Sequence, residues 1–283
     1  MARYALVVGI SHYESEYFES LSKAIIDANA VANLLNQDKR YKNVEVLTGE
    51  VTGAQLVRAL NTFLQKQAVK NEGLIYFTGH GFTVVDIAGK TEGYLATSDC
   101  RVIIEDGQAV GQKGGLPLKT LNELIQASDL SNLVVLLDAC HSGAFLERDV
   151  ERSFKAFGAH TDYYLITGCR GFEEGIAKKR EQHSVFTGAL LSGLSQDNAD
   201  EYGKVTGDRL FDFIYTELHS SNQEPIRMGI GRSIVLVEYP SKTKPVTAIL
   251  DEKGEVICPY QGLQAFDRNQ KEFFFGRKRL VDD

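Results

Sequence analysis

The sequence predicts an α/β fold in which a mostly parallel central sheet is flanked by helices on both faces. Apolar runs of strand length alternate along the chain with segments whose apolar residues recur at helical spacing. Leu133–Leu137 is apolar without alternation, as is typical of a parallel strand buried on both faces, and Leu74–Thr78 is a second strand-like run. Reactive side chains follow both runs directly, in Asp138–His141 and in Gly79–Gly81. Because parallel strands deliver such residues to the carboxyl edge of the sheet, the functional site is predicted there.

Strands and helices alternate through the first part of the chain. Tyr4–Ile10 is predicted to be a buried strand, and Leu21–Leu35 an amphipathic helix with Asp27 near its start. Val44–Thr48 is a second strand, and a further helix is expected to open at Gly53. This order places the strand that ends at the histidine third in a parallel arrangement.

The middle of the chain has shorter predicted elements and a long segment rich in glycine and polar residues. Gly93–Ala96 is predicted to be a short strand, and Leu118–Ala127 a short helix. Between them, Arg101–Pro117 is rich in glycine and polar residues, so we expect a surface loop there.

Helices and strands are again predicted after Leu133–Leu137, the strand that precedes Cys140. Tyr163–Thr167 is predicted to be a strand, and Arg170–His183 a charged, glycine-containing loop. Helices are expected over Val185–Leu194 and Asp208–Leu218, and Ile234–Glu238 is predicted to be the last strand of the same domain.

The composition changes after Pro240. We predict one domain over residues 1–240, a linker over 241–257 and the start of a new unit over 258–283. The aromatic run Phe273–Phe275 needs a core to pack against, and no helix or strand follows it, so the chain is expected to be cut from a longer one.

Composition limits the class of protein. With 283 residues, 43% of them hydrophobic and 24% charged, the chain fits a soluble globular protein with one substantial core. A formal net charge of −7 argues against a nucleic-acid partner. No apolar window is long enough to cross a membrane, and no signal peptide precedes the first strand. The cysteines Cys100, Cys140, Cys169 and Cys258 lie far apart, which favours a reducing, cytoplasmic location. Cys-x-x-Cys and His-Glu-x-x-His motifs are absent, so no zinc site is expected.

Cys140 and His80 are the candidate catalytic pair. A cysteine nucleophile works as the thiolate and needs a base beside it, and histidine titrates near neutral pH. Each residue also has an ordinary interpretation, Cys140 as a small buried apolar residue and His80 as a loop histidine. His141 is a rival base, although side chains of adjacent residues diverge. The backbone N–H groups of Gly81 and Cys140 are the candidate oxyanion donors, since a glycine lets a substrate carbonyl approach closely.

Four motifs together resemble those of the caspase-like cysteine peptidases, closest to their bacterial metacaspase or orthocaspase branch. They are Ala5–Tyr13, Leu21–Ala28 with its Asp-Ala pair, Tyr76–Gly81 and Leu136–Gly143. The resemblance covers residues 1 to 240 and implies a caspase-hemoglobinase fold with His80 and Cys140 as the catalytic dyad. Tyr163–Leu194 would correspond to the small-subunit half. The sequence has no convincing acidic cluster that matches the calcium site of that family, so no cofactor is expected and a calcium requirement is left open.

Two acidic residues predict the specificity. Asp138 is two positions before Cys140, so strand alternation places it on the same side, where a buried carboxylate needs a cation. Asp27 stands where metacaspases carry a second acidic residue of the pocket that binds the substrate residue before the cut. The resemblance therefore implies cleavage after arginine or lysine. The alternative is that Asp138 caps the turn after its strand and that Asp27 caps its helix.

Basic residues are also candidates for self-cleavage, because exposed loops are preferred sites of nicking. They are Arg148, Arg152 and Lys155 after the cysteine, and Lys178, Lys179 and Arg180 further on. The alternative is that both groups are solvated runs of charge.

The tail carries a second resemblance. Cys258–Phe266 and Glu272–Val281 are similar to the lead-in of bacterial STAND-type NTPases, although the phosphate-binding loop of those proteins is missing. The whole sequence thus predicts a caspase-like endopeptidase that acts as the effector domain of a larger regulated signalling or defence protein. Its expected partners are a substrate with a basic residue before the cut and C-terminal NTPase or sensor domains. The rival functions are a catalytically silent scaffold of the same fold and a thiol hydrolase of small acyl substrates.

Overall fold

A computed structural model describes residues 1–86, 88–140, 162–169, 182–219 and 224–241. Contacts within the chain define a first compact unit, Met1–Pro240, and a second, Ser241–Asp283. Apart from Ser241, the predicted linker and the predicted unit over 258–283 lie outside the described residues.

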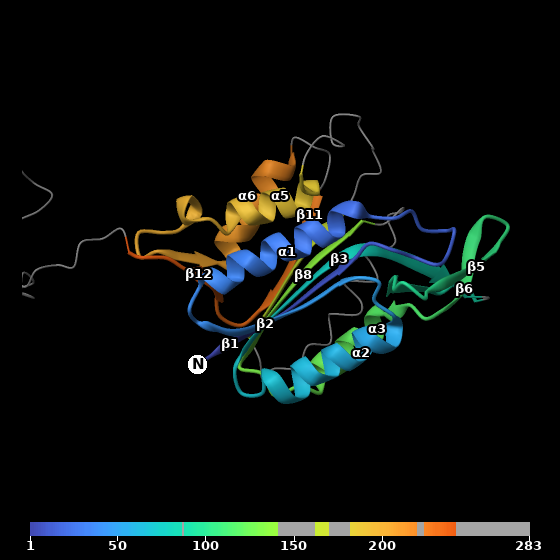
Figure 1. Cartoon of the computed structure of the whole chain (residues 1–283), viewed down its shortest axis with the longest axis horizontal. Helices are drawn as coiled ribbons and strands as arrows, with labels where there is room; N and C mark the ends of the chain where they lie inside the picture. Colours follow the sequence, from blue (N-terminus) through green and yellow to red (C-terminus); the bar gives the residue numbers. More distant parts are fainter. Residues whose placement is uncertain (87, 141–161, 170–181, 220–223, 242–283) are drawn as a thin grey trace, which may run out of the picture. The chain divides into compact units, whose positions relative to one another are not determined.

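The main sheet of the first unit is mostly parallel, as predicted (Figure 1). Its strands lie in the order β11-β9-β8-β3-β1-β2, and all neighbours in this order are parallel except β11, which is antiparallel to β9. The bounds of these strands are β1 Arg3–Ile10, β2 Tyr41–Gly49, β3 Glu72–Val85, β8 Asn132–Cys140, β9 Asp162–Cys169 and β11 Glu224–Ile230. The edge strand β11 has no counterpart among the predicted elements.

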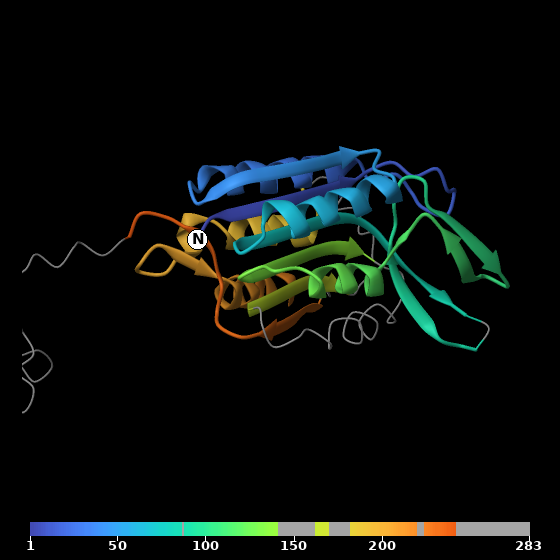
Figure 2. The ribbon, with the colours of Figure 1, turned by 90° about the horizontal axis from the view of Figure 1, so that it is seen from below.

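Helices cover both faces of the sheet, and the two views agree on their distribution (Figures 1 and 2). On one face lie α1, α5 and α6, with the short helix η3 beside them. On the other lie α2, which continues as one π-helical turn, η1, and α3. Their bounds are α1 Ser22–Gln37, α2 Gly53–Thr62, η1 Phe63–Gln67, α3 Leu118–Gln126, α5 Val185–Gly193, η3 Gln196–Asn198 and α6 Gly207–His219.

The cysteine strand shows why both faces need a cover. Leu133, Val135 and Leu137 belong to the core under α2 and α3, whereas Val134 and Leu136 belong to the core under α1, α5 and α6. Side chains of a strand alternate between faces, so an unbroken apolar run fills both cores. Each of these side chains is at most 1% exposed, and such burial stabilises the fold by roughly 1.5–3 kcal/mol per residue.

The histidine strand is longer than predicted. It pairs with β8 as far as His80, and from Gly81 onward it pairs with the antiparallel strand β4, Thr91–Leu95. His80 therefore lies where β3 changes partners and not at the end of a strand. The extension forms because Phe82 and Val84 are buried, which anchors a strand that has left the parallel sheet.

The expectation of a surface loop over Arg101–Pro117 is wrong. The segment forms a hairpin of β5, Arg101–Glu105, and β6, Gln108–Lys113, followed by the short strand β7, Leu116–Pro117. Asp106 and Gly107 connect the two hairpin strands with φ of 48° and 77°. Asp-Gly with positive φ at both positions is a strong local signal for a two-residue hairpin turn, and it was there to be found in the sequence.

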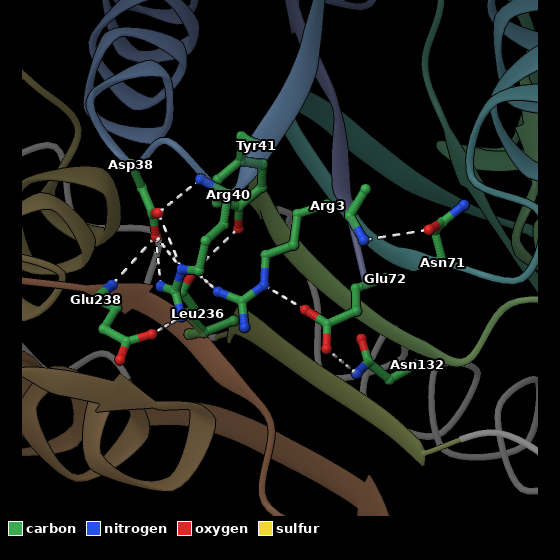
Figure 3. Close-up of polar contacts among 10 residues, drawn as sticks. Arg3, Asp38, Arg40, Tyr41, Asn71, Glu72, Asn132, Leu236 and Glu238 are labelled. Atoms are coloured by element: carbon green, nitrogen blue, oxygen red, sulfur yellow. Dashed lines mark hydrogen bonds and ion pairs between the residues drawn. The ribbon is translucent and has the colours of Figure 1, made fainter.

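The last predicted strand is also placed differently. It is β12, Val235–Glu238, and it pairs with β10, Lys204–Thr206, in a separate two-stranded sheet. Polar side chains hold it against the starts of the main strands (Figure 3). The Leu236 carbonyl accepts hydrogen bonds from Arg3 Nη1 at 2.9 Å and from the Tyr41 hydroxyl at 3.1 Å.

A second set of contacts fixes the end of β12 (Figure 3). The Glu238 backbone N–H donates to Asp38 Oδ2 at 3.1 Å, and Arg40 pairs with both Asp38 and Glu238. These contacts lie at the amino-terminal edge of the sheet, opposite the edge that carries His80 and Cys140.

Candidate active site

His80 and Cys140 are neighbours in the sheet. In the parallel pairing of β3 with β8, the Cα of His80 is the partner of the Cα of Cys140. Adjacent strands lie about 4.8 Å apart, so the two residues start from neighbouring backbone positions. His141 and the rest of 141–161 follow immediately and lie outside the described residues.

The His80 imidazole is oriented by a backbone carbonyl. Its Nε2 lies 2.8 Å from the Glu19 carbonyl oxygen. Because a carbonyl only accepts, Nε2 carries the proton of the neutral ring and Nδ1 is left as the proton acceptor. Burial lowers the pKa of His80, opposed by the bond to Glu19 and by its charge, so the neutral ring is favoured.

Aromatic residues of the segment between β1 and α1 enclose the same imidazole. The Phe18 ring stacks on it at 5.3 Å between centroids, and the Tyr13 ring lies at 4.9 Å. The Tyr13 hydroxyl accepts a hydrogen bond from the His80 backbone N–H at 3.0 Å and donates to the Ile10 carbonyl at 2.9 Å. Burial raises the pKa of Tyr13 well above its ordinary range, so it stays a hydroxyl. Sequence reasoning named Tyr13 only as part of a motif, and it missed Phe18 and Glu19.

Asp27 and Asp138 both lie beside the start of α5, Val185–Gly193. Asp27 lies on α1 and is 1% exposed, and Asp138 lies on β8 and is 4% exposed. Both carboxylates contact the segment that begins α5. His183 Nδ1 lies 2.7 Å from Asp27 Oδ1, and Ser184 Oγ donates to Asp138 Oδ2 at 2.5 Å.

Asp27 does not cap its helix, and the turn that Asp138 was predicted to cap lies outside the described residues. Asp27 lies inside α1, which begins after Leu21, and Asp138 Oδ2 accepts a second hydrogen bond from Thr187 Oγ1 at 2.6 Å. Burial raises the pKa of Asp138 to about 6, and the Asp27 charge adds to the increase while the hydrogen bonds from Ser184 and Thr187 oppose it. Asp138 therefore takes up its proton as the pH falls through about 6, well above the range in which a free aspartate does so.

Gly81 is part of the β3–β4 ladder, where it is paired with Leu95. A Cβ added there would meet Ala139 Cβ and the Tyr94 carbonyl oxygen, both at 3.5 Å, which is ordinary contact. Packing in the described structure thus does not require a glycine at this position. The assignment of the Gly81 and Cys140 amides as oxyanion donors stays a prediction.

Three residues that contact the acids were not predicted as site residues. They are His183, Ser184 and Thr187, at the start of α5. Ser184 had a signal, because a serine just before an apolar helical segment is a typical N-cap. The six basic residues considered for self-cleavage fall in 141–161 and 170–181, outside the described residues.

Comparison with known proteins identifies the family of the chain. Residues 2–227 match the model of the caspase domain family, Peptidase_C14. The chain belongs to the caspase domain family. The predicted family and its caspase-like α/β fold are confirmed, and membership supports a peptidase. The predicted STAND NTPase module lies beyond the matched residues and stays a prediction.

This caspase-domain chain is similar to metacaspases and to a solved structure at low sequence identity. Metacaspase-1 from two strains of Saccharomyces cerevisiae is 25% identical over 202 residues, which cover 67% of this chain and 45% of the relative. The chain thus spans less than half the length of these curated relatives. A crystal structure of protein GSU0716 from Geobacter sulfurreducens superposes with a TM-score of 0.59 over 86% of this chain and 99% of that one. At 15% identity it shows a shared fold alone. Among the described residues, no helix has the length and apolar character needed to cross a membrane.

Proposed function

We propose that this chain is a cysteine endopeptidase that cleaves proteins after arginine or lysine with a Cys140–His80 dyad. The observation that carries the proposal is the register of β3 and β8, which makes His80 and Cys140 backbone neighbours in a caspase domain. Adjacent backbone positions of this kind allow a nucleophile and its base to come within hydrogen-bond reach of each other.

In the proposed reaction, His80 Nδ1 removes the thiol proton of Cys140, and the thiolate attacks the scissile carbonyl carbon. The oxyanion that forms is stabilised by backbone N–H groups, for which Gly81 and Cys140 are the candidates. His80 then donates the proton to the leaving amine, a thioester remains, and water hydrolyses it. The Glu19 carbonyl supports both proton transfers, because it holds Nε2–H and keeps Nδ1 as the atom that gains and loses the proton.

The specificity follows from Asp27 and Asp138 in this proposal. Two buried carboxylates at one place are unfavourable unless a cation joins them, and the side chain of a substrate arginine or lysine supplies it. Arginine is preferred because its planar guanidinium can bond carboxylates through two N–H groups. A substrate aspartate would be repelled.

We also propose that the peptidase acts in the cytoplasm as the effector domain of a larger regulated protein. The support is the similarity of Cys258–Phe266 and Glu272–Val281 to the lead-in of STAND-type NTPases. A protein that contains such a module after residue 283 should show peptidase activity that changes when nucleotide binds.

The test is a positional peptide-library cleavage assay with wild-type protein, Cys140→Ala and His80→Ala. Cleavage after arginine and lysine is expected in the wild type, with losses of several orders of magnitude in each variant because both residues act in one unit. Far-ultraviolet circular dichroism should show that both variants keep the fold. Substantial cleavage by Cys140→Ala would overturn the mechanism. A wild type that neither cleaves peptides nor reacts with an arginyl chloromethyl ketone would instead support the silent scaffold.

A further inference from the structure

One residue at the start of α5 connects the two acids of the proposed pocket. The Ser184 backbone N–H donates to Asp27 Oδ2 at 3.1 Å, and its side-chain Oγ donates to Asp138 Oδ2 at 2.5 Å. The neighbouring His183 holds the other oxygen of Asp27, with Nδ1 at 2.7 Å from Oδ1. Ser184 is therefore a direct bridge between a carboxylate on α1 and a carboxylate on β8.

Hydrogen bonds from Ser184 to both acids restrict the positions of the two carboxylates. Two buried carboxylates repel each other, and rotation about their χ angles would let them separate. Hydrogen-bond donors on both of them remove that freedom and set the positions of the oxygens. A further donor to Asp138, Thr187 Oγ1 at 2.6 Å, comes from the same turn of helix α5, and the Thr78 side chain on β3 adds another. The start of α5 thus contacts both acids and contributes to their placement.

Fixed oxygens favour one kind of cation. A guanidinium offers its N–H groups in a rigid plane, so its binding depends on where the acceptor oxygens lie. An ammonium group is a compact charge on a flexible stem and tolerates different oxygen positions. The spacing of the two carboxylates thus decides how far arginine is preferred to lysine.

We propose that Ser184, supported by His183, is a specificity-determining positioning residue that holds Asp27 and Asp138 at the spacing a guanidinium requires. The inference rests on the proposed function, since it assumes that these acids bind the substrate residue before the cut. It adds the origin of the choice between arginine and lysine.

The competing explanation is that Ser184 only caps its helix. Its Oγ accepts a hydrogen bond from the Thr187 backbone N–H at 3.0 Å, as an N-cap does. The chain offers a matched control on the opposite face of the sheet. Thr52 caps α2, where its side chain accepts from the Gln55 backbone N–H at 3.3 Å, and it contacts neither acid.

The experiment compares kcat/KM for two peptides that differ only in arginine or lysine before the cut. It uses the wild type, Ser184→Ala, Ser184→Thr and Thr52→Ala. In Ser184→Ala we expect the arginine-to-lysine ratio to fall about tenfold, through a higher KM for the arginine peptide, because the bidentate geometry is lost. The ratio should stay at the wild-type value in Thr52→Ala, and Ser184→Thr should restore it because threonine keeps the hydroxyl. Alkylation of Cys140 by iodoacetamide should proceed at the wild-type rate in all of them.

The outcomes separate this inference from the function on which it rests. A wild type with no preference for basic residues overturns the proposed function. A wild type that prefers arginine, with an unchanged ratio in Ser184→Ala and a loss of melting temperature like that of Thr52→Ala, overturns the inference and leaves Ser184 as a cap.

A second pair of variants keeps the test valid if Ser184→Ala does not fold. The His183 side chain is 22% exposed and caps no helix, so His183→Ala should fold. It should lower the arginine-to-lysine ratio, and His183→Asn, which keeps an N–H donor, should lose less. Equal ratios in the wild type and both His183 variants would contradict the inference.

Discussion

At the scale of residues, burial of the Asp138 carboxylate is energetically unfavourable. The side chain is 4% exposed, and its oxygen is held by the hydroxyls of Ser184 and Thr187 and not by a cationic side chain in the described structure. Hydroxyl donors compensate only part of what a carboxylate loses when it leaves water. The pKa near 6 expresses this deficit. In the proposed pocket, the cation of a substrate arginine or lysine would offset this deficit.

This deficit predicts a stability that falls with pH. An unfolded Asp138 ionises near pH 3.8 and the folded one near pH 6, so between these values the folded state holds the proton that the unfolded state has released. The associated stability is present below pH 3.8 and is lost as pH rises toward 6. Asp138→Asn removes the titration. The free energy of unfolding of Asp138→Asn, measured relative to that of the wild type, should therefore increase by up to about 3 kcal/mol between pH 4 and pH 7.

Urea denaturation of both proteins at pH 4, 5, 6 and 7 measures the effect. The control is Asp38→Asn, because the pKa of Asp38 is shifted in the opposite direction. Partial burial tends to raise this pKa, but hydrogen bonds from Arg40 outweigh burial and hold the pKa below its usual value. A difference between wild type and Asp138→Asn that does not change with pH would contradict the assigned ionisation.

The residues that the sequence could predict are those that follow strands or sit in motifs. His80, Cys140 and Asp138 come from buried apolar runs whose direction fixes the edge of the sheet where they lie. Glu19 could not be predicted, because its contribution is a backbone carbonyl that any residue type would supply. Ser184 was recognisable as a helix start, but its contact with Asp27 joins positions 157 residues apart.

At the scale of elements, helices and strands with a strong apolar periodicity were predicted correctly, whereas a hairpin defined by the residues of its turn was missed. The helix over 21–35 and the strand over 4–10 were predicted within a few residues, because their apolar spacing is set by the cores they fill. The β5–β6 hairpin was missed, because Ile103 and Ile104 are 55% and 42% exposed and form no alternating buried face. Its signal lies in the Asp106-Gly107 turn.

That turn makes a prediction about local stability. Gly107 has φ of 77°, and a residue with a Cβ is destabilised by roughly 1–2 kcal/mol in this region. Gly107→Ala should therefore increase amide hydrogen exchange in β5 and β6 by about 5- to 30-fold. Gly111→Ala is the control, since Gly111 lies in β6 without a positive φ and a Cβ there meets the side chain of the exposed Ile103 at 3.2 Å. Equal exchange in the two variants would show that the turn does not hold the hairpin.

At the scale of the whole unit, the two ends of Met1–Pro240 are joined by a buried polar contact. Arg3 at the start of β1 donates to the Leu236 carbonyl of β12 across 233 positions of sequence, and it pairs with Glu72 at the start of β3 (Figure 3). Sequence periodicity carries no information about a contact over such a separation. This is why β12 was predicted as a strand but its separate sheet was not.

The contact gives a prediction about global stability. The Arg3 side chain is 9% exposed, and replacing it in Arg3→Met leaves Glu72 without its cation and removes one donor from Leu236. Breaking a buried pair in this way costs about 3–5 kcal/mol in the free energy of unfolding. Arg232→Met is the matched control, since Arg232 pairs with Asp162 but is 91% exposed, and about 1 kcal/mol or less is expected. Urea denaturation measures both. Similar losses in the two variants would mean that β12 is held by its pairing with β10 and by apolar packing, and that the Arg3 contact does not couple the ends of the unit.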